Sequence, residues 1–179
     1  MREQGFTRKD VGTLEMQRAI LRAQLHAEEN ALTYLMSNIR RKRPQDDGSS
    51  VSVLLCDRCA IDPIVYATME LPGNLVDDLM TEYGLRDALA RYSGRSKAST
   101  KGNFSEKGTY IDPLVILTDG VDEWRVDDGV RSLYDPKTVA VTFRDVLARL
   151  KISHLELGEN IKDIEERVAW VMTASGLKD

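Results

Sequence analysis

An apolar segment that ends on an acid–arginine pair constrains the fold of this 179-residue chain more than any other feature. It covers residues 51–67 and reads VSVLLCDRCAIDPIVYA. Its first part, Val51 to Leu55, is almost continuously apolar, which is typical of a strand in a parallel sheet covered on both faces. Asp57 and Arg58 follow this strand, and a helix is expected directly after them. The segment therefore predicts an α/β fold with a charged pair at the carboxyl end of a strand.

The start of that helix is predicted at Asp62-Pro63. Asp62 is a residue type that caps helices, and proline suits the first helical position because its missing amide hydrogen is not needed there. We therefore interpret Asp62 and Pro63 as structural residues of the helix start rather than as catalytic ones.

The first part of the chain has the periodicity of one long amphipathic helix. Thr13 can cap it and Pro44 ends it, while the basic run Arg40 to Arg43 suits the negative end of the helix dipole better than a nucleic-acid site. Shorter helices are expected between Asn74 and Tyr92, interrupted near Gly84. The apolar residues at helical intervals are Leu14, Leu21, Leu25, Leu32, Met36 and Ile39.

The second half predicts a strand, a helix, a strand and a helix. The strands are expected at residues 113–118 and 152–157, with a helix beginning at Asp135-Pro136 between them and the last helix beginning at Asn160. Residues 93–108 are rich in serine, glycine and lysine and are interpreted as a flexible insertion. The buried side of the last helix is predicted to carry Ile161, Ile164, Val168 and Val171.

Composition limits the classes of partner. The chain is 42% hydrophobic and 30% charged, enough for one globular domain, and its net charge of -4 gives no bulk attraction to nucleic acid or anionic membranes. No apolar run reaches the roughly 20 residues of a membrane helix, and the first residues lack the apolar core of a signal peptide. We therefore expect a soluble, cytoplasmic protein without membrane or nucleic-acid partners.

The two cysteines, Cys56 and Cys59, have CxxC spacing. A redox pair needs its first cysteine exposed at a helix start, whereas Cys56 is expected at the end of a buried strand. A zinc site needs about four ligands, and the two histidines, His26 and His154, do not have zinc-finger spacing. Unpaired structural cysteines are therefore the preferred interpretation.

The chain resembles P-loop kinase-like NTPases, and most closely the NadR-type AAA domain proteins. The resemblance is carried by residues 12–29 (GTLEMQRAILRAQLHAEE), 54–67 (LLCDRCAIDPIVYA) and 123–131 (EWRVDDGVR), together with the terminal strand and helix. It implies an ATP-binding domain with ATPase or phosphotransferase activity that depends on Mg²⁺ and ATP.

The resemblance also implies roles for four residues. Asp57 would orient Mg²⁺ through water or act near the nucleophile, and Arg58 would hold the substrate or the transferred phosphate. Arg131, with Arg125, would act as a lid arginine that binds phosphate oxygens while the lid excludes water. The local sequence alone is equally compatible with a surface loop in which Arg131 pairs with a neighbouring acid.

One part of the family pattern is missing. The sequence GxxxxGK[ST] occurs nowhere in the chain, and family members begin with a strand, a glycine-rich loop, a helix and a second strand that this chain lacks. We therefore expect residues 1–179 to form a single incomplete domain: a partial three-layer fold with about three parallel strands flanked by helices, without the first strand and the P-loop. An N-terminally truncated sequence explains this pattern, and a missing N-terminal segment or a protein partner would complete the sheet.

Without that loop, charge on the β- and γ-phosphates is not compensated, so ATP binding should be weak or absent and turnover very low. Two alternatives stay open. The chain could be an interaction module that pairs with a partner through its sheet edge or its long first helix. A thiol-redox protein that uses Cys56 and Cys59 ranks third.

Overall fold

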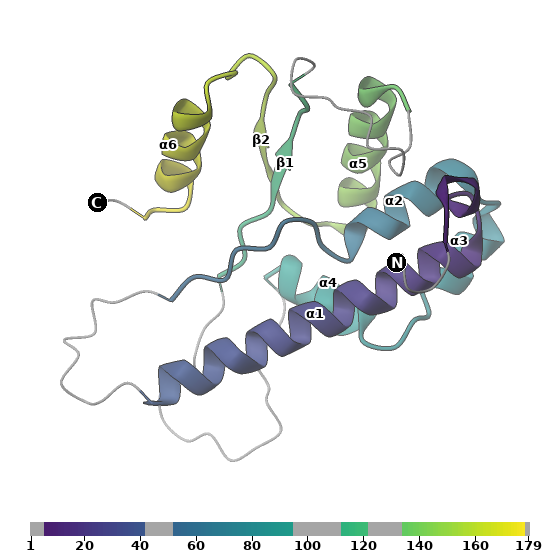
Figure 1. The fold of residues 1–179 in the computed structure, drawn as a ribbon, viewed down its shortest axis with the longest axis horizontal. Helices are drawn as coiled ribbons and strands as arrows, with labels where there is room; N and C mark the ends of the chain where they lie inside the picture. Colours follow the sequence, from purple (N-terminus) through teal and green to yellow (C-terminus); the bar gives the residue numbers. More distant parts are fainter. Residues whose placement is uncertain (1–5, 42–51, 95–111, 122–133, 178–179) are drawn as a thin grey trace. The chain divides into compact units, whose positions relative to one another are not determined.

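The computed structural model describes residues 6–41, 52–94, 112–121 and 134–177 (Figure 1). The chain divides into two compact units, Met1–Arg86 and Asp87–Asp179. The division falls within helix α4, which covers Leu85–Tyr92.

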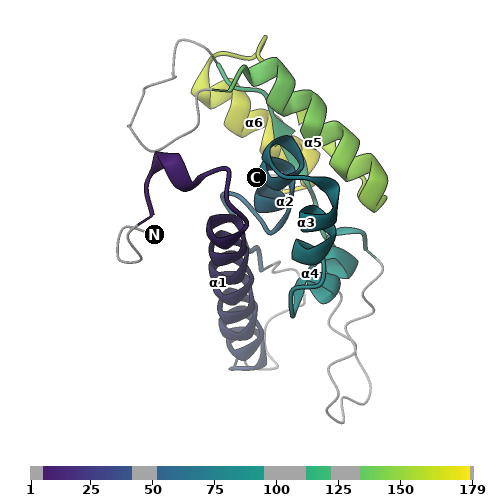
Figure 2. The same cartoon turned by 90° about the vertical axis from the view of Figure 1, so that its right-hand side faces the viewer.

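The first unit is helical in its described part. After a short 3-10 helix, η2 (Arg8–Asp10), the long helix α1 covers Leu14–Arg41. Its start is capped by Thr13, whose hydroxyl oxygen accepts a hydrogen bond from the Met16 amide at 3.3 Å. The predicted long helix and its cap are therefore confirmed. Helices α2 (Ile61–Glu70) and α3 (Gly73–Leu79) pack against α1 and against each other (Figure 2).

The core of this unit includes polar groups of α1. Gln17 is 1% exposed and Glu28 is 6% exposed, on the same side of α1 as the fully buried Leu21. The buried stripe therefore differs from the one predicted from apolar spacing alone. The buried apolar residues of the unit are Met16, Leu21, Ala60, Ile61, Ile64, Val65, Ala67, Val76, Leu79 and Leu85.

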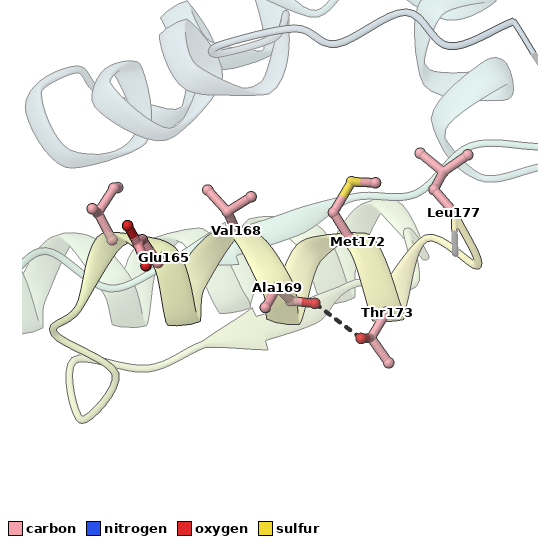
Figure 3. Close-up of a pocket in the computed structure, with 7 residues that line it drawn as sticks. Glu165, Val168, Ala169, Met172, Thr173 and Leu177 are labelled. Atoms are coloured by element: carbon pink, nitrogen blue, oxygen red, sulfur yellow. Dashed lines mark hydrogen bonds between the residues drawn. The ribbon is translucent and has the colours of Figure 1, made fainter. Parts of the chain in front are cut away.

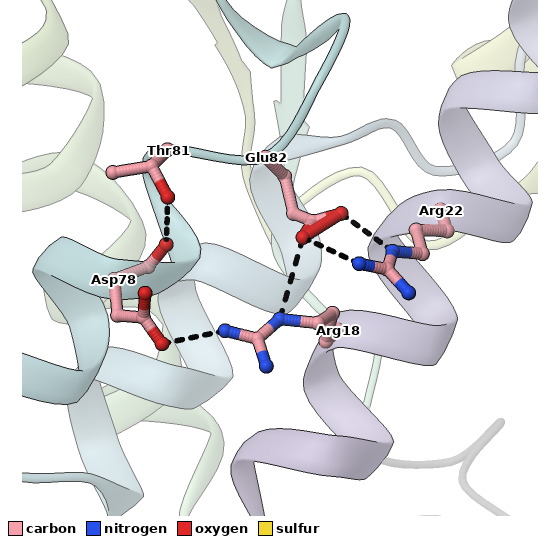
Figure 4. Close-up of polar contacts among 5 residues, drawn as sticks. All are labelled: Arg18, Arg22, Asp78, Thr81 and Glu82. Carbon is pink, nitrogen blue, oxygen red and sulfur yellow. Dashed lines mark hydrogen bonds and ion pairs between the residues drawn. The ribbon is translucent and has the colours of Figure 1, made fainter.

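Two arginines of α1 tie α3 and the turn after it to α1 (Figure 4). The Arg18 Nη2 atom lies 2.6 Å from Asp78 Oδ2, and the Arg22 guanidinium bonds both carboxylate oxygens of Glu82, at 2.5 and 2.8 Å. The bond to Arg22 lowers the pKa of Glu82 below its ordinary value. Gly84 has φ +85° and separates this turn from α4, which confirms the predicted interruption near this residue.

The strand predicted at Val51 to Leu55 is wrong for the part that the structure describes. Residues 52–55 have no regular secondary structure, and Val53 and Leu55 are 54% and 86% exposed. A buried parallel strand needs neighbouring strands to accept its amides and carbonyls, and no strand among the described residues pairs with this segment. Its apolar composition alone does not make it a strand.

The second unit contains a parallel βαβ arrangement. Strands β1 (Ile116–Thr118) and β2 (Leu155–Leu157) pair in parallel, with Ile116 opposite Leu155 and Thr118 opposite Leu157. Helix α5 (Pro136–Leu150) connects them, and Figure 1 shows α5 and α6 (Ile164–Ala174) on either side of the two strands. Both strands lie within predicted ranges, but the described residues contain a sheet of two strands rather than three.

Helix α5 begins and ends with clear signals. The Asp135 carboxylate accepts a hydrogen bond from the Thr138 amide at 3.0 Å, and Pro136 is the first helical residue, as predicted. Lys151 ends the helix in a left-handed conformation with φ +56°. The buried apolar residues of α5, of β2 and of the segments that follow β1 and α5 are Val121, Val146, Leu147, Ile152 and Leu157.

The last helix, α6, begins later than predicted and presents a different face. Asp163, not Asn160, is its cap, because the Asp163 carboxylate accepts hydrogen bonds from the Glu165 and Glu166 amides. Ile164 and Val168, predicted to be buried, are 60% and 55% exposed, whereas Arg167 is 8% exposed. The inward position is taken by an arginine whose guanidinium satisfies backbone carbonyls.

Two sequence-based predictions concern residues that the structure does not describe. The predicted insertion at 93–108 lies mostly outside the described residues, and the lid arginines Arg125 and Arg131 lie wholly outside them. Among the described residues, no helix combines the length and the apolar character that a membrane crossing requires.

Candidate functional site

The acid–arginine pair lies on an exposed loop that leads into α2. Asp57 and Arg58 are both exposed, and the Arg58 side chain retains 49% of its accessible surface. Arg58 has φ +73°, a left-handed conformation that costs a non-glycine residue about 1–2 kcal/mol. Contacts with the rest of the unit must therefore offset this cost.

Those contacts come from α1. The Gln24 side-chain amide donates a hydrogen bond to the main-chain carbonyl of Arg58 at 3.0 Å. Four residues further along α1, Glu28 Oε1 accepts a hydrogen bond from the Ala60 amide at 3.1 Å. The side chains of one helix thus hold the loop on both sides of Cys59.

Asp62 has a structural role, as expected, but it is not the cap residue. Because α2 begins at Ile61, Asp62 and Pro63 lie within its first turn. The Asp62 carboxylate accepts a hydrogen bond from the Cys59 amide at 3.0 Å and lies 3.6 Å from the Arg58 guanidinium. Burial raises the pKa of Asp62, while the Cys59 amide and the Arg58 charge act in the opposite direction.

The backbone amides just before α2 are therefore already bonded to protein carboxylates. Cys59 donates to Asp62 and Ala60 donates to Glu28, at the helix end where the dipole favours negative charge. A phosphate group near this loop would meet the exposed Arg58 guanidinium rather than these amides. Even without help from backbone amides, an arginine guanidinium can bind two phosphate oxygens at once.

The chemistry of the loop suits a water-mediated magnesium ion. Mg²⁺ commonly keeps several waters and is held by one or two carboxylates together with substrate phosphates, a role that the exposed Asp57 carboxylate fits. Among the residues that the structure describes, no group of three or more His, Cys, Asp or Glu side chains is arranged around a metal site.

Both cysteines are free thiols. Cys56 is exposed on the loop rather than buried at a strand end, so its predicted setting is wrong, although the prediction of unpaired cysteines is confirmed. Partial loss of hydration raises the pKa of the exposed Cys56 thiol, and the deeper burial of the Cys59 thiol raises its pKa to about 12. Raised pKa values keep both thiols protonated near neutral pH, which disfavours redox chemistry.

A second surface feature is an open apolar groove along α6 (Figure 3). Val168, Met172 and Leu177 project to one side of the helix, and the Thr173 hydroxyl donates to the Ala169 carbonyl at 2.9 Å. The groove is lined by Ile164, Glu165, Val168, Ala169, Met172, Thr173 and Leu177.

The sequence identified Asp57 and Arg58 but missed Gln24 and Glu28. The signal that could have found them is the polar pair at 24 and 28 on the face of α1 that carries Leu21, since a polar pair on a buried stripe implies a specific partner. Comparison with models of known protein families, with characterised proteins and with solved structures finds no match for this chain.

Proposed function

We propose that this chain carries the acid–arginine part of a nucleotide-phosphate site of the P-loop NTPase kind, with Mg²⁺ and ATP as its ligands. The observation that carries the proposal is the exposed Arg58, whose left-handed backbone is bonded by Gln24, beside the exposed Asp57 just before α2. The parallel βαβ arrangement of β1, α5 and β2 supports the α/β class to which such domains belong.

In this proposal the Arg58 guanidinium binds phosphate oxygens, and Asp57 orients a water of the magnesium ion. Mg²⁺, when bound, would neutralise charge on the phosphates. Arg125 and Arg131 are proposed to bind the same phosphate group as lid arginines and to exclude water from it. These roles rest on the sequence resemblance.

Binding to the chain alone should be weak. The Cys59 and Ala60 amides are engaged by Asp62 and Glu28, and the sequence contains no GxxxxGK[ST] loop to supply other amides and a lysine. We expect a dissociation constant for Mg-ATP on the order of 1 mM or weaker, and very low ATP turnover.

The test is a titration of the full chain with Mg-ATP, followed by backbone amide NMR. Shifts are expected at Asp57 to Ala60 and should be lost in Arg58→Ala. The matched control is Arg86→Ala, which removes one exposed positive charge elsewhere on the chain and should leave the shifts intact. Asp57→Asn should change weak binding little.

Two results would contradict the proposal. The absence of shifts at the loop, or shifts that persist in Arg58→Ala, would remove the phosphate role of Arg58. Tight Mg-ATP binding that is abolished in Asp57→Asn would instead indicate a complete site. It would contradict the proposal that the chain carries only part of one.

A second candidate function is pairing with another polypeptide through an edge of the sheet. It is favoured by the size of that sheet, because two parallel strands in the described residues leave an outer edge on each strand without a strand partner. If a second copy of the chain adds a strand there, amide exchange at residues 116–118 or 155–157 slows as protein concentration rises. Unchanged exchange across a dilution series would exclude pairing between copies.

A further inference from the structure

Arg58 is held both from within its own loop and from outside it. Its left-handed backbone is unfavourable for a side chain with a Cβ atom. Within the loop, the Asp62 carboxylate lies 3.6 Å from the Arg58 guanidinium and accepts a hydrogen bond from the Cys59 amide at 3.0 Å. The main-chain carbonyl of Arg58 is instead held from α1, 34 residues earlier in the chain.

The support on α1 consists of two side chains one turn apart. A glutamine amide carries two N–H hydrogens. Gln24 directs its amide nitrogen to the Arg58 carbonyl at 3.0 Å and, over a longer 3.4 Å, to Glu28 Oε1. The same Glu28 oxygen accepts the Ala60 amide at 3.1 Å. The contacts form a continuous path from the Arg58 carbonyl through Gln24 and Glu28 to the Ala60 amide.

We propose that Gln24 and Glu28 form a clamp that sets the backbone conformation of residues 58–60 and thereby positions the Arg58 guanidinium for an anionic phosphate group. They are positioning residues, because they act through the loop and do not themselves present positive charge. The phosphate part of this inference rests on the function proposed above, whereas the clamp itself does not.

The clamp has a consequence that simple helix packing lacks. If Gln24 only contributed to the contact between α1 and α2, its removal would lower the stability of the whole unit evenly. If it holds the loop, its removal releases residues 58–60 while the middle of α2 stays protected. Cys59 reports on this release, because it lies between the two clamped residues and its side chain is only partly exposed.

The first experiment compares Gln24→Ala with Arg22→Ala in the full chain. Both variants remove a bond from α1 to another segment, but Arg22 bonds Glu82 rather than the loop. The readouts are amide exchange at Ala60 and the alkylation rate of Cys59 in a Cys56→Ser background. Gln24→Ala should accelerate both by roughly fivefold or more, as expected for the loss of one net hydrogen bond.

Arg22→Ala should leave both loop readouts unchanged. The clamp is overturned if Gln24→Ala leaves exchange and alkylation at native rates, or if Arg22→Ala accelerates them equally. Glu28 separates hydrogen bonding from charge: Glu28→Gln keeps an oxygen that can accept the Ala60 amide and should preserve its protection, whereas Glu28→Ala should lose it.

The second experiment is the Mg-ATP titration on these variants. Gln24→Ala should weaken the shifts at the loop several-fold, and Arg22→Ala should retain them. Equal shifts in the native chain and in Gln24→Ala would overturn the positioning role. If the native chain does not respond to Mg-ATP, the proposed function fails, and the exchange and alkylation rates alone still decide whether the clamp exists.

Discussion

The Arg167 guanidinium of α6 donates a hydrogen bond to the main-chain carbonyl of Asp119, the residue directly after β1, at 3.2 Å. It also donates to the carbonyls of Ile161 at 2.9 Å and Gly158 at 3.4 Å. One buried side chain thus joins the start of α6 to the loop after β2 and to the end of β1. This connection explains why a charged residue of α6 points inward.

Replacing Arg167 with methionine should destabilise the second unit by roughly 3 kcal/mol. Methionine has a side chain of similar length but no hydrogen-bond donor, so the carbonyls would lose their charged partner. Urea denaturation measures this change. Arg167→Lys, with one nitrogen in place of the guanidinium fork, should lose less. Arg149→Met makes the same replacement at an exposed position of α5 and should stay within about 0.5 kcal/mol. Equal effects at the two positions would contradict a stabilising role for the Arg167 bonds.

The start of α6 gives a second prediction. Asp163→Ala should destabilise the second unit by about 1 kcal/mol, because the Glu165 and Glu166 amides would lose their acceptor. Asp163→Asn should retain most of the stability. Asn160→Ala is the matched control and should have little effect, since the helix begins after this residue. A larger loss of stability in Asn160→Ala than in Asp163→Ala would contradict the assignment of Asp163 as the cap.

The sequence predicted the starts of α1 and α5 correctly from local signals, but it misplaced the starts of α2 and α6. Helix α1 follows Thr13 and α5 follows Asp135, and both caps act on backbone amides within the next three residues. Such signals are local, so they do not depend on the rest of the fold. Residues 52–55 of the predicted strand do not form one, because a strand depends on partners elsewhere in the chain, which a run of apolar residues does not guarantee.

The candidate site was predictable only in part, for the same reason. Asp57 and Arg58 stand out as neighbours in the sequence, but the residues that hold them lie more than thirty positions away on α1. The face of α6 was also misjudged, because Ile164 and Val168 have the apolar spacing of a buried stripe. The inward direction is set instead by the carbonyls that Arg167 satisfies.

The two thiols should react at different rates. At about pH 8, Cys56 should be alkylated well before Cys59, because Cys56 is exposed and the pKa of Cys59 is raised to about 12 by burial. Peptide mass spectrometry after iodoacetamide treatment measures both rates. In denaturant the rates should become similar. Equal rates in the folded chain would contradict the buried position of Cys59, and disulfide formation after mild oxidation would revive the redox alternative.

Asp62 should make stability depend on pH in an unusual direction for a carboxylate. Burial raises its pKa above 3.8, so the folded chain binds this proton more readily than the unfolded chain does. Its contribution to the free energy of unfolding is therefore largest at low pH and falls as pH rises through the raised pKa. Asp62→Asn removes the charge and keeps an oxygen for the Cys59 amide. We expect this variant to gain stability relative to the native chain at about pH 7 more than at about pH 3.5.

Glu82 provides the opposite case as a control for that measurement. Its pKa is lowered from 4.5, mainly by the hydrogen bond from Arg22, so its contribution is present above 4.5 and is lost as pH falls through the lowered pKa. Glu82→Gln should therefore lose stability at about pH 7, with the difference from the native chain shrinking at about pH 3.5. Urea midpoints of the three proteins at both pH values test the two signs together. A greater loss of stability for Asp62→Asn at neutral pH than at acidic pH would show that the bonds from Cys59 and Arg58 outweigh the cost of burying the Asp62 carboxylate.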